Sequence, residues 1–208
     1  MASLFALAPA LAFTSCSEPE SPPDNSAEAN EIAAPVTDEA SSEIPSIDVG
    51  LKVGATAPLD AKFNSGDGSE TLESLLEDGP AVLVFTRSVE WCPFCQTQLK
   101  GINAIVGDLE KRGYKLYGIS YDSLDSQDRF SKNQMLQYKM LSDEKSTTID
   151  AFGLRDPQYT EGKAVGVPYA SVMVINKDGK IIAKSVSGDF KKRPTNEQLL
   201  ALVDAIQR

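Results

Sequence analysis

The chain has 208 residues, 24% of them charged, and a formal net charge of −10 at pH 7. It contains no histidine and three cysteines, which argues against a four-ligand zinc site within one chain and excludes a histidine base. Nine of its 30 acidic residues lie within residues 17–50, so the remainder is nearly neutral and lacks the basic field typical of nucleic-acid binding. No metal, cofactor or nucleic-acid partner is therefore expected.

Residues 1–16 form an uncharged, mostly apolar segment that ends at Cys16. The segment is too short to cross a bilayer as a helix and has the pattern of a signal peptide. Its last six residues, Leu11 to Cys16, resemble a bacterial lipobox, although Phe13 stands where an aliphatic residue is usual. The resemblance implies a lipid on Cys16 and an extracytoplasmic domain, periplasmic or at the cell surface, held at a bacterial membrane by that lipid alone. A plain cleaved signal peptide is the alternative, and it implies the same side of the membrane.

Residues 17–49 carry nine acidic groups, no Lys or Arg and no aromatic residue. Such a composition cannot bury enough apolar surface to offset the entropy of ordering the chain. We therefore expect a disordered acidic tether. As a flexible coil it would span roughly 30–35 Å on average, enough to hold the following domain clear of a membrane surface.

The remaining residues, 50–208, alternate short hydrophobic runs with helical patterns, which predicts one α/β domain. Residues 81–85 form a continuous apolar run rich in valine, as expected for a strand buried on both faces. A helix is expected over 92–112, because apolar residues recur on one face and Gly113 can end it. A strand over 115–121 follows. This strand–helix–strand unit predicts parallel pairing, with the start of the helix at the carboxyl end of the first strand.

Beyond residue 121 the expected elements are shorter. Asn176 to Gly179 form a turn with glycine where a positive φ is needed, so the flanking strands should form an antiparallel hairpin. Thr195 and Gln198 fit a capping box at the start of the last helix. The expected elements are a helix over 126–135, an extended segment over 138–141, a helix over 147–152, strands over 170–175 and 180–186, and a helix over 195–206.

Cys92 and Cys95 are the only cysteines after Cys16, and Pro93 and Phe94 separate them. A thiolate rather than a thiol attacks a disulfide, so a redox cysteine needs surroundings that stabilise the anion. The start of a helix supplies free amide groups and the positive end of the macrodipole, and Pro93 suits a first helical turn. We expect Cys92 to be the exposed nucleophile and Cys95 the more buried resolving thiol. A structural disulfide is the alternative, but closing so short a loop removes little unfolded-state entropy.

The segment Trp91 to Cys95 resembles a thioredoxin-type active site, and Pro168 resembles the cis-proline that faces the dithiol in that fold. The resemblance implies a thioredoxin-like fold, an α/β domain with a central mixed β-sheet flanked by helices. It makes Pro168 a site residue, with a strand-edge proline as the alternative. Trp91 would shield the disulfide, unless it only packs. Thr86 stands where thioredoxins keep a buried aspartate, so proton transfer from Cys95 would rely on water or another acid.

More narrowly, nearly all of residues 50–208 resemble the redoxin and alkyl hydroperoxide reductase/thiol-specific antioxidant superfamily, in its peroxiredoxin-like branch. The segments that carry the resemblance are 53–58, 81–95, 141–144, 151–153 and 176–180. Peroxiredoxins place a proline seven residues and a Thr or Ser three residues before the peroxidatic cysteine, and neither Cys92 nor Cys95 fits that register. The arginine that usually begins the late core strand is also absent. Arg87 is then the candidate to polarise a peroxide, and a surface ion pair with Glu90 or another acid is the alternative.

These residues support three hypotheses. The first is a thiol–disulfide oxidoreductase that acts on protein or small-molecule thiols and disulfides through Cys92 and Cys95. The second is a thiol peroxidase with antioxidant activity, in which Cys92 reduces a peroxide and Cys95 resolves the sulfenic acid. The third is a tethered binding module with a redox-inert disulfide.

Overall fold

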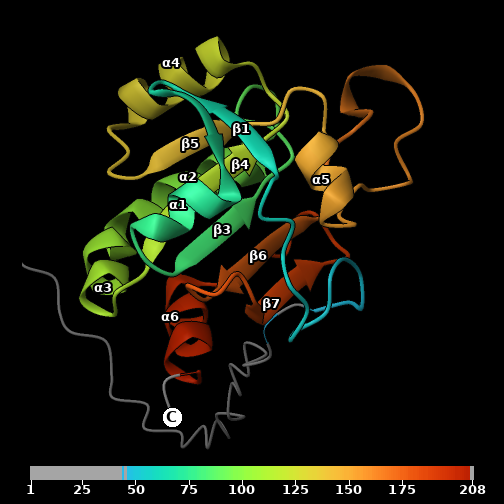
Figure 1. Ribbon diagram of the computed structural model, residues 1–208. Helices are drawn as coiled ribbons and strands as arrows, with labels where there is room; N and C mark the ends of the chain where they lie inside the picture. Colours follow the sequence, from blue (N-terminus) through green and yellow to red (C-terminus); the bar gives the residue numbers. More distant parts are fainter. Residues whose placement is uncertain (1–43, 45, 207–208) are drawn as a thin grey trace, which may run out of the picture. The chain divides into compact units, whose positions relative to one another are not determined.

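The computed structural model describes Ile44 and residues 46–206, so the expected signal peptide, Cys16 and most of the expected tether lie outside the described residues. Its centre is a seven-stranded mixed sheet with the strand order β2-β1-β5-β4-β3-β6-β7 (Figure 1). The strands are β1 (Lys62–Ser65), β2 (Gly68–Thr71), β3 (Ala81–Phe85), β4 (Lys115–Ser120), β5 (Lys139–Ser142), β6 (Ala170–Ile175) and β7 (Ile181–Ser187).

Strand β3 is buried along its whole length, as its continuous apolar run predicts. It pairs in parallel with β4, which pairs in parallel with β5. On its other side β6 is antiparallel, with Phe85 opposite Ser171, and β7 follows through the predicted hairpin turn, where Gly179 has a φ of 77°. The carboxyl ends of β3 and β4 and the start of β6 therefore meet at one edge of the sheet.

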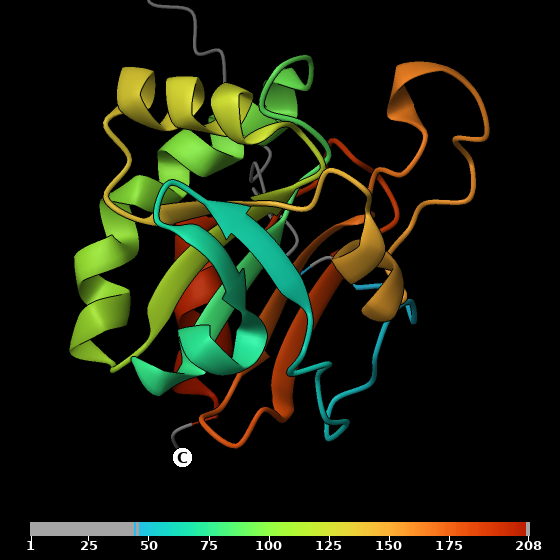
Figure 2. The same cartoon turned by 45° about the horizontal axis from the view of Figure 1, so that its top comes forward.

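Helices cover both faces of this sheet (Figure 2). On one face α2, α3 and α6 pack through Leu99, Leu109 and Leu199 against Val82 and its neighbours. On the other face α1 and α5 pack around Leu83. The helices are α1 (Leu72–Glu77), α2 (Pro93–Ile102), α3 (Val106–Lys111), α4 (Leu124–Gln134), α5 (Thr147–Ala151) and α6 (Asn196–Asp204), with 3-10 turns η1 (Asn103–Ile105) and η2 (Gly162–Ala164). None of these helices combines the length and the apolar character that crossing a membrane requires.

The single helix expected over 92–112 is interrupted. It consists of α2, the 3-10 turn η1 and α3. The side chain of Asn103 explains the break, because its Oδ1 accepts from the N–H of Gln137 at 2.7 Å and its amide donates to the carbonyl of Met135. These bonds fasten the middle of the segment to the loop before β5. The bend keeps the apolar face, including Ile102 and Val106, on the sheet.

The hairpin β1–β2 and helix α1 are absent from the sequence prediction. Both strands have four residues, and β2 is exposed or half-exposed throughout, so neither produces a strong hydrophobic pattern. Helix α1 has six residues, and its start is fixed by a reciprocal cap between Thr71 and Ser74. Short elements of this kind depend on the rest of the sheet for their stability.

The packed domain begins slightly before residue 50. The N–H of Ile47 donates to the carbonyl of Val186 in β7 at 2.9 Å, and the side chains of Ile47 and Val49 pack against the core. Ile47 and Val49, which the expected tether included, therefore belong to the packed domain.

Candidate active site

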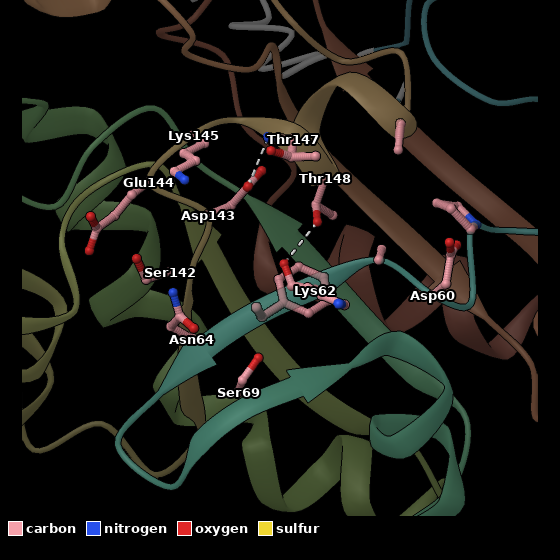
Figure 3. A pocket seen from close by; sticks show the side chains of 14 residues that line it. Asp60, Lys62, Asn64, Ser69, Ser142, Asp143, Glu144, Lys145, Thr147 and Thr148 are labelled. Carbon is pink, nitrogen blue, oxygen red and sulfur yellow. Dashed lines mark hydrogen bonds between the residues drawn. The ribbon is translucent and has the colours of Figure 1, made fainter.

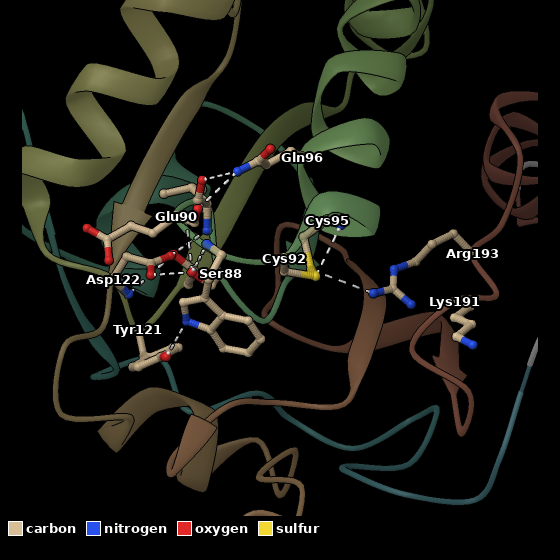
Figure 4. Close-up of a disulfide and its surroundings, with 12 residues drawn as sticks. Ser88, Glu90, Cys92, Cys95, Gln96, Tyr121, Asp122, Lys191 and Arg193 are labelled. Carbon is tan, nitrogen blue, oxygen red and sulfur yellow. Dashed lines mark hydrogen bonds between the residues drawn. A yellow bond between two sulfur atoms is a disulfide. The ribbon is translucent and has the colours of Figure 1, made fainter. Parts of the chain in front are cut away.

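The two cysteines lie at the start of the helix that follows β3, as the sequence predicts. Cys92 caps α2, and its Sγ accepts a hydrogen bond from the N–H of Cys95 at 3.3 Å. Pro93 occupies the first helical turn, and the two sulfur atoms are joined in a disulfide (Figure 4). The N–H of Cys95 points at the Sγ of Cys92 and would stabilise its thiolate once the disulfide is reduced.

The burial of the pair differs from the prediction. The sequence predicts an exposed Cys92, but its exposed fraction is 2%, against 0% for Cys95. The prediction is wrong because residues 188–195, here named the β7–α6 loop, fold over the start of α2. Because Cys92 is buried, a partner sulfur can reach it only when neighbouring groups move.

Arg193 and Phe190 of the β7–α6 loop form the cover. Arg193 donates from Nη2 to the Sγ of Cys95 at 3.7 Å (Figure 4). The ring of Phe190 packs edge-on against Phe94, with centroids 5.8 Å apart. Burial, and then the charge of Arg87, lower the pKa of Arg193 to about 10, so its guanidinium stays a cation at neutral pH.

Arg193 is absent from the sequence prediction. Its only local signal is the basic run Lys191-Lys192-Arg193, which reads as an exposed stretch. The contact joins residues 98 positions apart, and nothing in the neighbouring sequence indicates it.

Arg87 is buried, with an exposed fraction of 5%. Its Cζ lies 5.2 Å from the ring centroid of Trp91, 4.6 Å from that of Tyr159 and 4.5 Å from that of Phe190. The alternative of a surface ion pair with Glu90 is wrong, because Arg87 is enclosed by aromatic rings and Glu90 accepts from a serine hydroxyl of α4. Within the described part of the chain, Nε of Arg87 has no hydrogen-bond partner.

Trp91 is half-buried beside the disulfide and is held by a chain of hydrogen bonds. Its Nε1 donates to the hydroxyl of Tyr121 at 2.9 Å, and that hydroxyl donates to the carbonyl of Lys163. The ammonium group of Lys163 lies 5.3 Å from the ring centroid of Trp91. Burial raises the pKa of Tyr121, so its hydroxyl keeps its proton at neutral pH.

Asp122 fixes the loop between β3 and Cys92 and is also absent from the sequence prediction. Its carboxylate accepts from the hydroxyls of Ser88 and Ser120 and from the N–H of Val89, each at 2.7 Å. Burial is the largest influence on its pKa, which is raised. The position at the carboxyl end of a parallel strand, beside β3, was the signal that could have identified it.

Thr86 and Pro168 both lie close to the end of β3. Thr86 is fully buried, and its hydroxyl has no hydrogen-bond partner among the described residues. Pro168 is buried just before β6 and lines a cavity of about 240 Å³ with Arg87 and Tyr159. A direct role of Thr86 or Pro168 in the chemistry stays a prediction.

A larger cavity, of about 470 Å³, lies between β1 and α5 (Figure 3). No cysteine lines it. Its most buried acid, Asp143, accepts from the N–H groups of Thr147 and Ile149 at 2.9 and 2.8 Å and so caps α5. Burial raises the pKa of Asp143 despite these bonds. The carboxylate is therefore occupied by a structural role.

The mixed sheet, the cysteine pair at the start of α2 and the proline before β6 define a thioredoxin-like redox domain. A model of the AhpC/TSA family matches residues 53–184. Peroxiredoxin Bcp of Escherichia coli (strain K12) is 31% identical over 142 residues, which cover 68% of this chain and 88% of that protein. The 1-Cys peroxiredoxin A of Oryza sativa subsp. japonica is 24% identical over 165 residues, covering 76% of this chain and 74% of that one.

Solved structures give the same fold. Peroxidoxin BcpB from Mycobacterium tuberculosis aligns over 76% of this chain and 99% of its own, with a TM-score of 0.65 at 24% identity. Xanthomonas campestris peroxiredoxin Q aligns over 76% and 98%, with a TM-score of 0.63 at 24% identity. The chain belongs to the AhpC/TSA family and is a redox enzyme of the peroxiredoxin type, as the sequence resemblance implies.

Proposed function

We propose that this protein is a thiol–disulfide oxidoreductase in which Cys92 is the nucleophile and Cys95 the resolving thiol. One observation carries the proposal: the two sulfur atoms are bonded within the first turn of α2 while the whole domain is folded. A catalytic cycle that closes and opens this bond requires no unfolding of the helix.

In the reducing direction, the Cys92 thiolate attacks one sulfur of a partner disulfide. A mixed disulfide forms and the other partner sulfur leaves as a thiolate. Cys95, deprotonated, then attacks the Sγ of Cys92, which releases the second partner thiolate and closes the Cys92–Cys95 bond. Two electrons pass from the protein to the partner, and the reverse sequence oxidises a partner dithiol.

The structure supplies one stabilising group to each sulfur. The N–H of Cys95 faces the Sγ of Cys92, and the Arg193 guanidinium faces the Sγ of Cys95. Charge-assisted contacts of this kind favour the thiolate over the thiol, which speeds both attack and departure.

The test compares Cys92→Ser with Cys95→Ser in exchange with a model protein disulfide. We expect Cys92→Ser to abolish exchange and Cys95→Ser to accumulate a mixed disulfide that mass spectrometry identifies on Cys92. Full exchange activity of Cys92→Ser would contradict the assignment. A reduction potential well below about −300 mV would instead indicate an inert, structural disulfide.

A thiol peroxidase is the second candidate, supported by membership of the AhpC/TSA family and by the 31% identity to Peroxiredoxin Bcp. The Cys92 thiolate would attack the O–O bond of a hydroperoxide, giving a sulfenic acid and releasing an alcohol or water after proton transfer. Cys95 would then displace water and form the disulfide. Stopped-flow fluorescence of Trp91 after mixing reduced protein with hydrogen peroxide tests this candidate, and a signal no faster than the oxidation of a free thiol would exclude it.

We also propose that the protein acts outside the cytoplasm, attached through a lipid on Cys16. The lipobox-like sequence before Cys16 supports this location. Metabolic labelling with a radioactive fatty acid should mark the wild-type protein and leave Cys16→Ser unmarked. Equal labelling of both proteins would contradict the proposal.

A further inference from the structure

Four cationic side chains gather around the disulfide. Arg87 stacks against Trp91 and Phe190, and Arg193 contacts Cys95. The ammonium group of Lys163 lies over the ring of Trp91, and that of Lys191 lies 5.8 Å from the ring centroid of Phe190. Figure 4 shows Arg193 and Lys191 on the same side of the sulfur atoms.

These cations have no ion-pair partner within 4 Å in the part of the chain that the structure describes. The two acids that line the cavity beside Arg87 accept hydrogen bonds within their own loops. Asp156 accepts from the N–H of Gln158 at 3.0 Å, and Asp189 accepts from the N–H of Lys191 at 2.9 Å. Asp189 is the acid whose charge acts on Arg193.

Arg87 is the strongest indication of a ligand. Its exposed fraction is 5%, its Nε has no partner among the described residues, and it lines the cavity of about 240 Å³ beside Pro168. Burying a guanidinium without an anion or a full set of acceptors is costly. The three surrounding rings stabilise the charge but accept no hydrogen bond from Nε, which stays without a partner among the described residues. A carboxylate, which matches the planar fork of a guanidinium, would accept that hydrogen bond.

We infer that the Arg87–Arg193 face binds the carboxylate of a small acidic thiol or disulfide, which the protein uses as its exchange partner. This inference rests on the proposed oxidoreductase function and names its substrate class. Arg87 holds the carboxylate in the cavity. Arg193, in contact with Cys95, stabilises that sulfur as the leaving group.

The acidic thiol reduces the Cys92–Cys95 disulfide in two exchange steps. The thiolate of the acidic partner attacks the Sγ of Cys92 and breaks the Cys92–Cys95 bond, so that Cys95 departs as a thiolate beside Arg193. A second partner thiolate attacks the partner sulfur of the mixed disulfide and releases Cys92. Two electrons reduce the protein, and the partner leaves as its symmetric disulfide.

Binding is tested on the oxidised protein by titration with succinate at constant ionic strength, following the fluorescence of Trp91, the only tryptophan. We expect a saturable change in the wild-type protein that chloride does not reproduce. Arg87→Gln should weaken it by about tenfold, as expected for loss of one charge-assisted contact. Arg193→Gln, in a loop rather than in the core, tests the same site if the first variant fails to fold. Lys177→Gln, in the β6–β7 turn at the opposite end of the sheet, should behave as the wild type.

Kinetics test the substrate class. The disulfide is reduced with 3-mercaptopropionate and with the uncharged 2-mercaptoethanol, and each rate is divided by the thiolate concentration. We expect a preference of about tenfold for the acidic thiol in the wild-type protein, falling towards one in Arg87→Gln and Arg193→Gln and unchanged in Lys177→Gln.

The outcomes of these experiments distinguish the carboxylate site from the oxidoreductase function. Exchange with both thiols at equal rates, and no saturable response to succinate, would overturn the carboxylate site while the oxidoreductase proposal stands. Failure to react with either thiol would remove the oxidoreductase proposal and the substrate class that rests on it. If Lys177→Gln lowers the preference for the acidic thiol as strongly as Arg87→Gln does, the preference comes from the overall charge of the protein. That result would overturn the carboxylate site.

Discussion

Asp122 shows how a residue outside the cysteine pair can set its geometry. Its carboxylate holds Ser88, Ser120 and Val89, and so determines the path of the chain from β3 to Cys92. Two of these donors lie 33 and 34 positions away in the sequence. The loop before Cys92 is thus fixed by β4 rather than by its own sequence.

Replacing Asp122 with alanine should therefore destabilise the protein. The Ser88 hydroxyl and the Val89 N–H would remain buried without a partner, which costs about 2 kcal/mol. Urea denaturation measures the loss. Asp125→Ala, at an exposed position of α4, should lower the free energy of unfolding by less than about 0.5 kcal/mol, and an equal loss in the two variants would contradict the role of Asp122.

Arg193 gives a prediction for the reduced protein. Because its guanidinium contacts the Sγ of Cys95, Arg193→Gln should move the pH midpoint of the thiolate absorbance at 240 nm to higher pH. Cys95→Ser identifies the contribution of Cys92 to the signal. A midpoint that stays at the wild-type pH in Arg193→Gln would show that the contact does not favour the anion.

The sequence predicts the cysteine pair because local rules place it there. A buried strand, a proline in the first turn and an amphipathic stripe are all read from neighbouring residues. Arg193 and Asp122 join the site through contacts between segments far apart in the chain, so no local pattern indicates them. The predicted exposure of Cys92 is wrong for the same reason, because the β7–α6 loop that packs against the start of α2 lies far along the chain.

At the scale of elements, the β7–α6 loop packs against the start of α2 beside the disulfide. Phe190 packs edge-on against Phe94, and an aromatic pair of this kind contributes about 0.5–1.5 kcal/mol. Phe190→Ala should therefore open the cover more often and speed reduction by a small neutral thiol by about two- to tenfold. Val53→Ala removes an exposed apolar side chain of a different loop and should leave the rate unchanged. Equal rates for Phe190→Ala and the wild type would show that Phe190 does not limit access.

The β6–β7 turn gives a second prediction at this scale. Gly179 has a positive φ, and a Cβ added there would lie 2.6 Å from Cδ2 of Leu59. Gly54 also has a positive φ but would meet no atom within 4 Å. Gly179→Ala should therefore lower the free energy of unfolding by about 1 kcal/mol more than Gly54→Ala does, because only the first adds a clash. Thermal or urea denaturation of the two variants measures the difference.

The elements that the sequence predicts best carry their own end signals. Thr195 and Gln198 form the expected capping box, and Gly179 takes the expected turn conformation. The break after α2 follows instead from Asn103, whose partners lie before β5. The helical pattern over 92–112 is compatible with a straight or a bent helix, and the tertiary contacts decide between them.

At the scale of the whole molecule, buried carboxylates make stability depend on pH. Burial raises the pKa of Asp122 and of Asp143 above 3.8, so the folded protein binds these protons more tightly than the unfolded chain does. Their contribution to stability is present at low pH and is lost as pH rises through the raised pKa. Asp67 and Asp108 have lowered pKa values, through hydrogen bonds from Lys139 and Lys111, and lose their contribution as pH falls below 3.8.

Asp122 and Asp143 therefore affect stability above pH 3.8, and Asp67 and Asp108 affect it below pH 3.8. Because the chain has no histidine, no imidazole titrates in the upper range. The urea midpoints of the oxidised protein just above pH 3.8 and at pH 7 should therefore differ less in Asp122→Asn than in the wild type. Asp125→Asn should keep the wild-type difference. An unchanged difference in Asp122→Asn would mean that Asp122 does not titrate in this window.

The covering loop ends at Thr195, the residue that caps α6, and the side chain of the next residue, Asn196, donates to the carbonyl of Gly101 in α2 at 3.0 Å. The β7–α6 loop therefore runs directly into α6, and the hydrogen bond of Asn196 holds the start of α6 against α2, the helix that bears the cysteines. Any attachment that loosens α6 would loosen the cover as well. A fusion that loosens α6 at the C-terminus should therefore accelerate reduction of the disulfide relative to the unfused protein, so that the reactivity of Cys92 depends on the state of the last helix.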